Sequence, residues 1–311
     1  MTDISNFNWV QLNDLHWQAL QLLETRHGDV WPYSAKRAAR IARQVAAAVH
    51  EAAPGWQPSV ILEIGAGPFH PLSHGLVFYL NGASTLIATD FPEQLHDTAQ
   101  AARASFNLAA DALAFPENFA FEDTPERKAG ILTRAKQLPL AAMQEGDWSA
   151  LLRFGGARFA YASLNQAQQH LPPGQFDFLF SIAVLEHVEQ PQEVLRWHHQ
   201  LLKPGGIGYH LVGLEDHRYF ETPDTFPPWH FMIDGEYGHA STIRQDLRIN
   251  GLRSSQWREQ FALAGFDCLL WREENVYPVP AGLSEQLRAE FRILPPKDLE
   301  CFRIEAVVRK R

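Results

Sequence analysis

The sequence predicts an α/β fold built on a mostly parallel sheet, and three observations carry the prediction. Apolar runs rich in β-branched residues alternate with helical segments over most of the chain, as in right-handed βαβ units. The runs are apolar along their whole length, which is typical of parallel strands buried on both faces. Near the C-terminus, two strand-like runs leave little room for a helical crossover, which favours an antiparallel edge.

The expected elements begin with helical residues 13–50, interrupted near residues 28–32 because Pro32 disfavours helix at the residue before it. Strand and helix then alternate. Strands are expected at residues 59–64, 85–90, 159–163, 176–183 and 206–213, followed by the two C-terminal strands at 267–276 and 301–310. Helices are expected at residues 70–80, 92–106, 192–202 and 254–265.

Two segments are longer than ordinary connections between elements. Residues 111–156 carry helical pieces, and residues 214–250 are rich in aromatic residues, proline and histidine. We interpret both as insertions in one large domain, residues 57–311, that follows an N-terminal helical cap, residues 1–56. Because open α/β sheets bind ligands at the carboxyl ends of their strands, the cap and the second insertion are expected to cover a ligand pocket there.

Composition and charge indicate a globular protein that binds neither nucleic acid nor a membrane. Of the 311 residues, 46% are hydrophobic and 20% are charged. The formal net charge is −9, and the basic residues between 36 and 43 fit a solvated helix face rather than a phosphate-binding surface. No run reaches the roughly 18 apolar residues of a membrane span. The N-terminus lacks a secretory signal, and Cys268 and Cys301 cannot form a disulfide framework, which predicts a cytoplasmic location.

A glycine-rich turn after the first strand is the strongest functional signal. Residues 63–67 read Glu-Ile-Gly-Ala-Gly, and glycine lets a backbone turn sharply and lets a ligand approach main-chain N–H groups. The second strand ends at Asp90, 23 residues after Gly67 (90 − 67). A carboxylate at that position can accept hydrogen bonds from both ribose hydroxyls of an adenosine. The alternative role for Asp90 is a helix N-cap before Pro92.

These features would also suit a nicotinamide dehydrogenase. The dinucleotide fingerprint, however, requires a third glycine where this chain has His70. Two further motifs accompany the turn. Residues 181–188 read Ser-Ile-Ala-Val-Leu-Glu-His-Val at the end of the fourth strand, and residues 201–206 read Leu-Leu-Lys-Pro-Gly-Gly before the fifth.

With these motifs the chain resembles the class I S-adenosylmethionine (SAM)-dependent methyltransferases. The resemblance covers residues 58–308 apart from the two insertions. It implies a Rossmann-like, mostly parallel seven-stranded sheet with an antiparallel C-terminal strand, SAM as cofactor and S-adenosylhomocysteine as product. The turn would hold the methionine end of SAM and Asp90 the ribose, while the third and fourth strand ends would border the adenine and the methyl group. The cofactor-binding residues it implies are Glu63, Gly65, Ala66, Gly67, Asp90, Phe91, Ala162, Ser163, Ser181, Ile182 and Ala183.

Residues 214–232 and 248–257 resemble bacterial methyltransferases of small metabolites and surface-glycan sugars, which implies a small-molecule or glycan acceptor. The run Phe-Pro-Pro-Trp at residues 226–229 is similar to a motif of nucleic-acid amino-methyltransferases. That motif belongs at the end of the fourth strand, whereas this run follows the fifth, so we interpret it as a rigid loop element. The sequence leaves the oligomeric state open, with a homodimer as one possibility.

Two histidines are candidates for the general base that would take a proton from an acceptor hydroxyl. His217 opens the second insertion beside Glu215 and Asp216, and a carboxylate can orient an imidazole for this role. The alternative role for His217 is a turn cap. His187 follows the fourth strand and is the second candidate. A metal site made from Glu215, Asp216, His217 and Asp224 has no supporting spacing, so no metal is predicted.

Several aromatic side chains are candidates for the donor and acceptor pocket, because aromatic faces can stabilise a sulfonium cation. The residues expected to contact the substrate are Trp31, Tyr33, Phe220, Trp229 and His230. Transfer to a hydroxyl is favoured because histidines gather near the expected methyl position. The alternatives are N-methylation of a small metabolite, which needs no base, and a non-catalytic protein that binds SAM.

Overall fold

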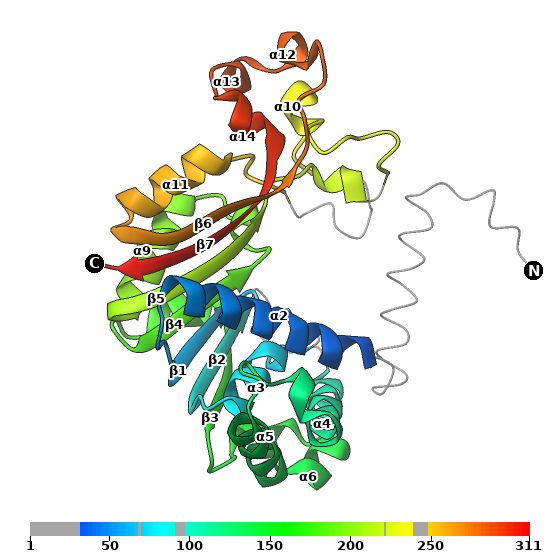
Figure 1. Cartoon of the computed structure of the whole chain (residues 1–311), viewed down its shortest axis with the longest axis vertical. Helices are drawn as coiled ribbons and strands as arrows, with labels where there is room; N and C mark the ends of the chain where they lie inside the picture. Colours follow the sequence, from blue (N-terminus) through cyan, green and yellow to red (C-terminus); the bar gives the residue numbers. More distant parts are fainter. Residues whose placement is uncertain (1–31, 68–69, 91–96, 221, 239–247) are drawn as a thin grey trace, which may run out of the picture.

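The computed structural model describes residues 32–67, 70–90, 97–220, 222–238 and 248–311. Its centre is a seven-stranded sheet in the order β3-β2-β1-β4-β5-β7-β6 (Figure 1). The strands are β1 (Val60–Ile64), β2 (Thr85–Asp90), β3 (Arg158–Ser163), β4 (Phe176–Ile182), β5 (Leu202–Gly213), β6 (Phe266–Val276) and β7 (Cys301–Lys310). Strands β1 to β5 pair in parallel, and β7 runs antiparallel to both β5 and β6. The predicted Rossmann-like sheet with an antiparallel C-terminal strand is confirmed.

The strand order reverses between β1 and β4. From β1 the chain continues outward through β2 and β3, and it then returns to the other side of β1 to form β4 and β5. Ile64, the last residue of β1, pairs with Thr89 of β2 and with Ser181 of β4. Open α/β sheets bind ligands outside the carboxyl ends of the strands at such a reversal. The segment that follows Ile64 therefore lies where a ligand is expected.

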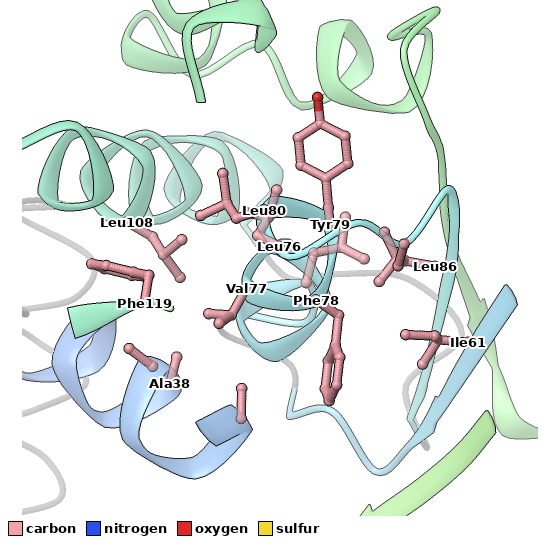
Figure 2. Close-up of a cluster of buried hydrophobic side chains, with 14 of the residues drawn as sticks. Ala38, Ile61, Leu76, Val77, Phe78, Tyr79, Leu80, Leu86, Leu108 and Phe119 are labelled. Atoms are coloured by element: carbon pink, nitrogen blue, oxygen red, sulfur yellow. The ribbon is translucent and has the colours of Figure 1, made fainter. Parts of the chain in front are cut away.

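One face of the sheet is covered by α2 (Pro32–Ala52), α3 (Ser73–Leu80) and α4 (Thr98–Ala114), which share a core with the strands. Helix α3 is buried on nearly all sides, which explains why its last five residues, 76–80, are all apolar or aromatic. Figure 2 shows its side chains between Ala38 of α2, Leu108 of α4 and Ile61 of β1. These three helices and the sheet therefore form one packed unit.

Helix α2 is the part of the predicted N-terminal cap that the structure describes; residues 1–31 lie outside the described residues. It begins at Pro32, which suits a first helical turn because the missing N–H has no partner there in any helix. Its inward face is a row of small residues, from Ala35 to Val49, buried in the main core. No helix in the described ranges, α2 included, combines the length and the apolar character required to cross a bilayer.

The opposite face is covered by α8 (Leu164–His170), α9 (Pro191–Leu201) and α11 (Ser254–Leu263). Leu195 of α9 and Trp257 and Phe261 of α11 are buried against the strands in a second core cluster. A sheet whose strands are apolar on both sides requires cover on both faces, and these helices supply the second layer.

The first insertion enlarges the helical layer around α4. It contains η2 (Pro116–Asn118), α5 (Pro125–Gln137), α6 (Leu140–Gln144) and α7 (Trp148–Leu152). Thr124 and Asp147 cap α5 and α7 by accepting main-chain hydrogen bonds. Ile131 and Met143 are buried in the same core as α3. This insertion therefore belongs to the packed domain.

The second insertion and the segment between β6 and β7 form a smaller lobe, at the top of Figure 1. The helices of this lobe are η4 (His217–Phe220), α10 (Phe231–Asp234), α12 (Leu283–Gln286), α13 (Ala289–Arg292) and α14 (Pro296–Glu300). Phe231, Leu283, Phe291 and Phe302 share a separate core there. The sequence did not indicate helices between the last two strands. With four or five residues each, they are too short for a parallel crossover, so the antiparallel pairing is kept.

Arg253, directly before α11, joins this lobe to the sheet. Its guanidinium is fully buried and donates to the main-chain oxygens of Leu214 (Nη1, 2.6 Å), Asp298 (Nε, 3.1 Å) and Cys301. Burial lowers the pKa of Arg253 to about 10. A buried guanidinium requires hydrogen-bond acceptors, and here they come from the residue after β5 and from the junction of α14 with β7.

Candidate active site

The glycine turn after β1 is hydrogen-bonded to the end of β2. The N–H groups of Gly65 and Ala66 both donate to the main-chain oxygen of Thr89, at 2.8 and 3.0 Å. Gly65 and Gly67 have φ values of 74° and 82°, in the left-handed region that favours glycine. A Cβ on Gly65 would lie 2.2 Å from Cγ2 of Val184, whereas a Cβ on Gly67 would meet no atom of the described residues within 4 Å. The turn is therefore packed at its first glycine and open at its second.

Asp90, at the end of β2, faces the open glycine. Its Oδ2 accepts a hydrogen bond from the N–H of Gly67 at 2.5 Å. The alternative role as a helix cap falls to Asp97 instead, whose side chain accepts from the N–H of Gln100 at the start of α4. Tyr161 of β3 lies close enough that burial and then the charge of Asp90 raise its pKa to about 12. Sequence analysis missed Tyr161; the signal was its position two residues before the end of a strand.

Glu63 contributes a buried carboxylate directly before the turn. Nδ1 of His74 in α3 donates to its Oε1 at 2.6 Å, which fixes the side chain. Its Oε2 is buried and has no hydrogen-bond partner among the described residues. A buried carboxylate oxygen normally has a donor, so this atom is suited to a ligand that carries N–H groups.

The end of β3 was predicted to border an adenine. Ser163 is buried there, and its hydroxyl accepts from the N–H of Gln166 at 3.2 Å, while the Gln166 side chain accepts from the N–H of Ser163 at 3.1 Å. This capping box starts α8. Ala162 is half-buried beside it. The Ser163 hydroxyl therefore serves the helix, and Phe91, the other predicted adenine contact, lies outside the described residues.

The end of β4 brings an unusual backbone conformation to the site. Ser181 is fully buried, and its Oγ lies 2.8 Å from Nδ1 of His210 in β5, so its hydroxyl bonds within the sheet. Ile182 is half-buried, and the exposed Ala183 has a φ of 53°, rare for a residue with a side chain. The N–H of Ala183 donates to the main-chain oxygen of Leu211 at 2.9 Å. Such strained residues cluster at functional sites.

Beyond Ala183, the short turn η3 (Leu185–His187) brings three polar side chains together with η4. The rings of His187 and His217 lie 4.9 Å apart, at an angle of 64°. Glu186 lies with them, and one nitrogen or oxygen from each of the three residues is within 4.8 Å of the other two. We refer to Glu186, His187 and His217 as the η3–η4 cluster. Both predicted base candidates therefore meet, together with a carboxylate that sequence analysis did not identify.

Glu186 is buried, with an exposed fraction of only 2%. Burial raises its pKa to about 8, and the charge of nearby Glu215 adds to this shift against the opposing hydrogen bond from Gly213. That bond runs from the N–H of Gly213 to Oε1 at 3.3 Å. Oε2 is buried and lacks a hydrogen-bond partner among the described residues.

The carboxylates next to His217 in the sequence are bound by other groups. Glu215 accepts from Nδ2 of Asn275 at 2.8 Å. Asp216 forms a buried ion pair with Arg218 at 2.6 Å, and Arg218 also binds Asp234 at 2.8 Å. These bonds organise the insertion, so the carboxylate in the η3–η4 cluster is Glu186.

The end of the second insertion holds the turn that carries Glu186 and His187. Asn250 donates from Nδ2 to the main-chain oxygens of Leu185 and Val188, at 2.8 and 3.1 Å, and from its N–H to that of Glu186 at 2.6 Å. Nδ1 of His187 lies 3.0 Å from the main-chain oxygen of Arg248. The position of η3 is thus set by four hydrogen bonds to one short segment.

The predicted substrate residues divide into two groups. Phe220 is 60% exposed, and its ring lies 5.8 Å from that of His217. Trp229 packs on Phe302 in the core of the smaller lobe, and His230 pairs with Asp234 at 3.3 Å. Phe220 therefore lies at the η3–η4 cluster, while Trp229 and His230 contribute to packing within the lobe. Trp31 and the side chain of Tyr33 lie outside the described residues.

Comparison with known proteins identifies one family. A family model described as a methyltransferase domain matches residues 35–270. The chain is also similar in structure to a SAM-dependent methyltransferase from Mesorhizobium loti, with 17% identity, a TM-score of 0.43 and coverage of 85% of this chain and 96% of that one.

Two other solved structures are similar at the same level. A SAM-dependent methyltransferase from Methanosarcina mazei has 12% identity and a TM-score of 0.43 over 82% of this chain and 93% of that one. A geranyl diphosphate methyltransferase in complex with SAM has 10% identity and a TM-score of 0.45 over 88% and 85%. No curated protein matches the sequence.

Proposed function

Because this chain belongs to the methyltransferase-domain family, we propose that it transfers a methyl group from SAM to a hydroxyl of a small molecule or a glycan sugar. The observation that carries the proposal is the packing of Gly65 on Val184, which precedes Glu186 by two residues and His187 by three. The turn suited to a cofactor and the cluster suited to proton transfer thus lie side by side, at the carboxyl ends of β1 and β4. Membership of a methyltransferase family excludes the nicotinamide dehydrogenase alternative.

The residues around the glycine turn fit SAM. Gly67 leaves open space beside its Cα, and the carboxylate of Asp90, at the end of β2, accepts a hydrogen bond from the N–H of the same glycine. The buried Oε2 of Glu63 would accept a hydrogen bond from the ammonium group of the methionine part, which would give this atom the donor it lacks among the described residues. When bound, SAM supplies an electrophilic methyl group on a sulfonium centre.

The acceptor hydroxyl is proposed to lie against the η3–η4 cluster. Its oxygen forms the new bond to the methyl carbon as the bond from sulfur to that carbon breaks, and its proton must leave. An imidazole can take up such a proton, and His217, which is buried, is the first candidate, with His187 second. The exposed ring of Phe220 beside His217 is placed to cover the acceptor and exclude water.

The proposal is tested by incubating the protein with SAM and a panel of alcohols, phenols, sugars, sugar nucleotides and matched amines. Formation of S-adenosylhomocysteine identifies turnover, and mass spectrometry of the product locates the methyl group. We expect methylation on oxygen. A methyl group found on nitrogen would replace the hydroxyl acceptor with an amine, and SAM binding without turnover on any acceptor class would favour the non-catalytic alternative.

A further inference from the structure

We propose that the η3–η4 cluster of Glu186, His187 and His217 binds a first-row divalent metal ion, with Zn²⁺ as the best match. The site differs from the set considered in the sequence, because it uses the two residues after β4 in place of the carboxylates beside His217. Metal binding itself does not depend on the proposed function. The role of the ion, described below, does rest on it.

The spacing of the three side chains fits one ion. The candidate ligand atoms lie within 4.8 Å of one another. Ions of this kind bind nitrogen and oxygen at about 2.0–2.2 Å, so two ligands of one ion can be at most about 4.4 Å apart. Small rotations of the side chains are therefore sufficient to close the site.

The buried oxygen of Glu186 is independent evidence for a ligand. The residue is 2% exposed, and Oε2 has no hydrogen-bond partner among the described residues. A carboxylate oxygen removed from water without a partner is costly to the fold. The hydrogen bond from the N–H of Gly213 goes to the other oxygen, Oε1, and is long at 3.3 Å. A cation between Oε2 and the two imidazoles would supply the missing interaction.

His187 is oriented as metal-binding histidines are. Its Nδ1 lies 3.0 Å from the main-chain oxygen of Arg248, which can only accept, so Nδ1 carries the proton. Nε2 is then the basic nitrogen. A hydrogen bond from the other ring nitrogen to a main-chain oxygen fixes the tautomer and orientation of most ligating histidines. The Asn250 bonds to Leu185 and Val188 hold the same turn, so two of the three ligands are fixed before any ion binds.

The donor set selects the class of ion. Two imidazoles and one carboxylate suit zinc and iron(II), whereas Mg²⁺ and Ca²⁺ prefer oxygen ligands alone. Three protein ligands leave coordination positions open for water or a substrate. If the proposed function holds, an acceptor hydroxyl can occupy such a position and lose its proton to solvent more readily, because the ion lowers its pKa. His217 would then act as a ligand rather than as the proton acceptor.

The test uses tag-free, full-length protein stripped of metal with a chelator. Zn²⁺ is titrated calorimetrically without SAM or acceptor, and Co²⁺ is used as a spectroscopic probe of the coordination geometry. We expect one ion per chain in the wild type. Glu186→Gln and His217→Ala should each weaken binding by more than about tenfold, since loss of even a supporting group costs 10–100-fold. His170→Ala, which removes an exposed histidine at the end of α8, is the matched control and should bind as the wild type does.

Circular dichroism and thermal melting establish that each variant is folded, and Glu186→Gln preserves the shape of the side chain if His217→Ala fails to fold. The proposal is overturned if the wild type binds no stoichiometric ion, or if Glu186→Gln binds Zn²⁺ as tightly as the wild type. Methyl transfer is measured separately. Zinc binding without turnover would retain the site and reject the proposed function, whereas turnover by a protein that binds no ion would do the reverse.

Discussion

Gly65 lies directly against Val184, so that a Cβ added to the glycine would fall 2.2 Å from Cγ2 of the valine. The contact joins the turn after β1 to the loop after β4. It also places a left-handed residue, φ 74°, at the point of closest approach. Neither partner could be enlarged without moving the cofactor turn or the loop that leads to the η3–η4 cluster.

Gly65→Ala is therefore expected to lower the free energy of unfolding by about 2–5 kcal/mol, from left-handed strain and overpacking together. Gly67→Ala shares the positive φ but meets open space, and it should cost only about 1–2 kcal/mol. Urea unfolding measures both. Replacing Val184 by alanine should recover part of the loss in the Gly65 variant. Equal losses for the two glycine variants would contradict the proposed contact.

Asp90→Ala should weaken SAM binding by about 1.5–3 kcal/mol, because a charged acceptor at the end of β2 is removed. Isothermal titration calorimetry measures the change. Asp97→Ala is the control: it removes the cap of α4 and should cost about 1 kcal/mol of stability with SAM affinity unchanged. If Asp90→Ala bound SAM like the wild type, the ribose assignment would be wrong.

His217→Ala should lower turnover by about 10²–10⁴-fold while SAM affinity stays nearly constant, whether the ring takes the proton or holds the ion. Turnover is followed by S-adenosylhomocysteine release and affinity by calorimetry. His170→Ala, remote in the sequence and exposed, should turn over at the wild-type rate. A His217 variant within a few-fold of wild type would reduce this residue to a structural role in η4.

Stability should fall in acid because of His198. This ring is fully buried in α9, stacked on His210 at 5.5 Å, and burial lowers its pKa to about 3. The unfolded chain takes up this proton below its ordinary pKa of 6.5, whereas the folded chain does so only near 3. Between these values the unfolded state binds more protons, so stability drops by about 1.4 kcal/mol per pH unit for this group as pH falls.

His198→Leu should therefore reduce the slope of unfolding free energy against pH by one proton between pH 6.5 and 3. Urea unfolding at a series of pH values gives the slope, and a melt at pH 8 establishes that the variant is folded. A slope identical to that of the wild type would show that His198 does not carry the acid sensitivity.

Most of the fold could be predicted from the sequence because its signals are local. The apolar runs that form β1, β2 and β4 are almost fully buried, and Pro32, where the sequence predicts an interruption, is the first residue of α2. The glycine turn could be predicted equally well, because the positive φ angles at Gly65 and Gly67 favour glycine over other residues.

The η3–η4 cluster could be predicted only in part, because it depends on contacts distant in the sequence. His187 and His217 were identified as separate candidates. Glu186 is held in the cluster by hydrogen bonds from the N–H of Gly213 to its side chain and from the N–H of Asn250 to its main-chain oxygen. The side chains of Ser163 and Ser181 are similar cases. Their positions in the strands were predicted, while the bonds of their hydroxyls to Gln166 and His210 follow from neighbouring elements.

The three hydrogen bonds that Arg253 donates have a consequence for how the smaller lobe unfolds. Its guanidinium donates to the main-chain oxygens of Leu214, directly after β5, of Asp298, in the middle of α14, and of Cys301, the first residue of β7. If any one of these segments unfolded alone, the buried guanidinium of Arg253 would lose a hydrogen-bond acceptor while it remained in an apolar interior. They should therefore unfold as one cooperative unit, and the amide protons of all the segments that bind Arg253 should exchange at a common rate. A substitution that destabilises the second insertion should therefore speed amide exchange in β7 more than in β1.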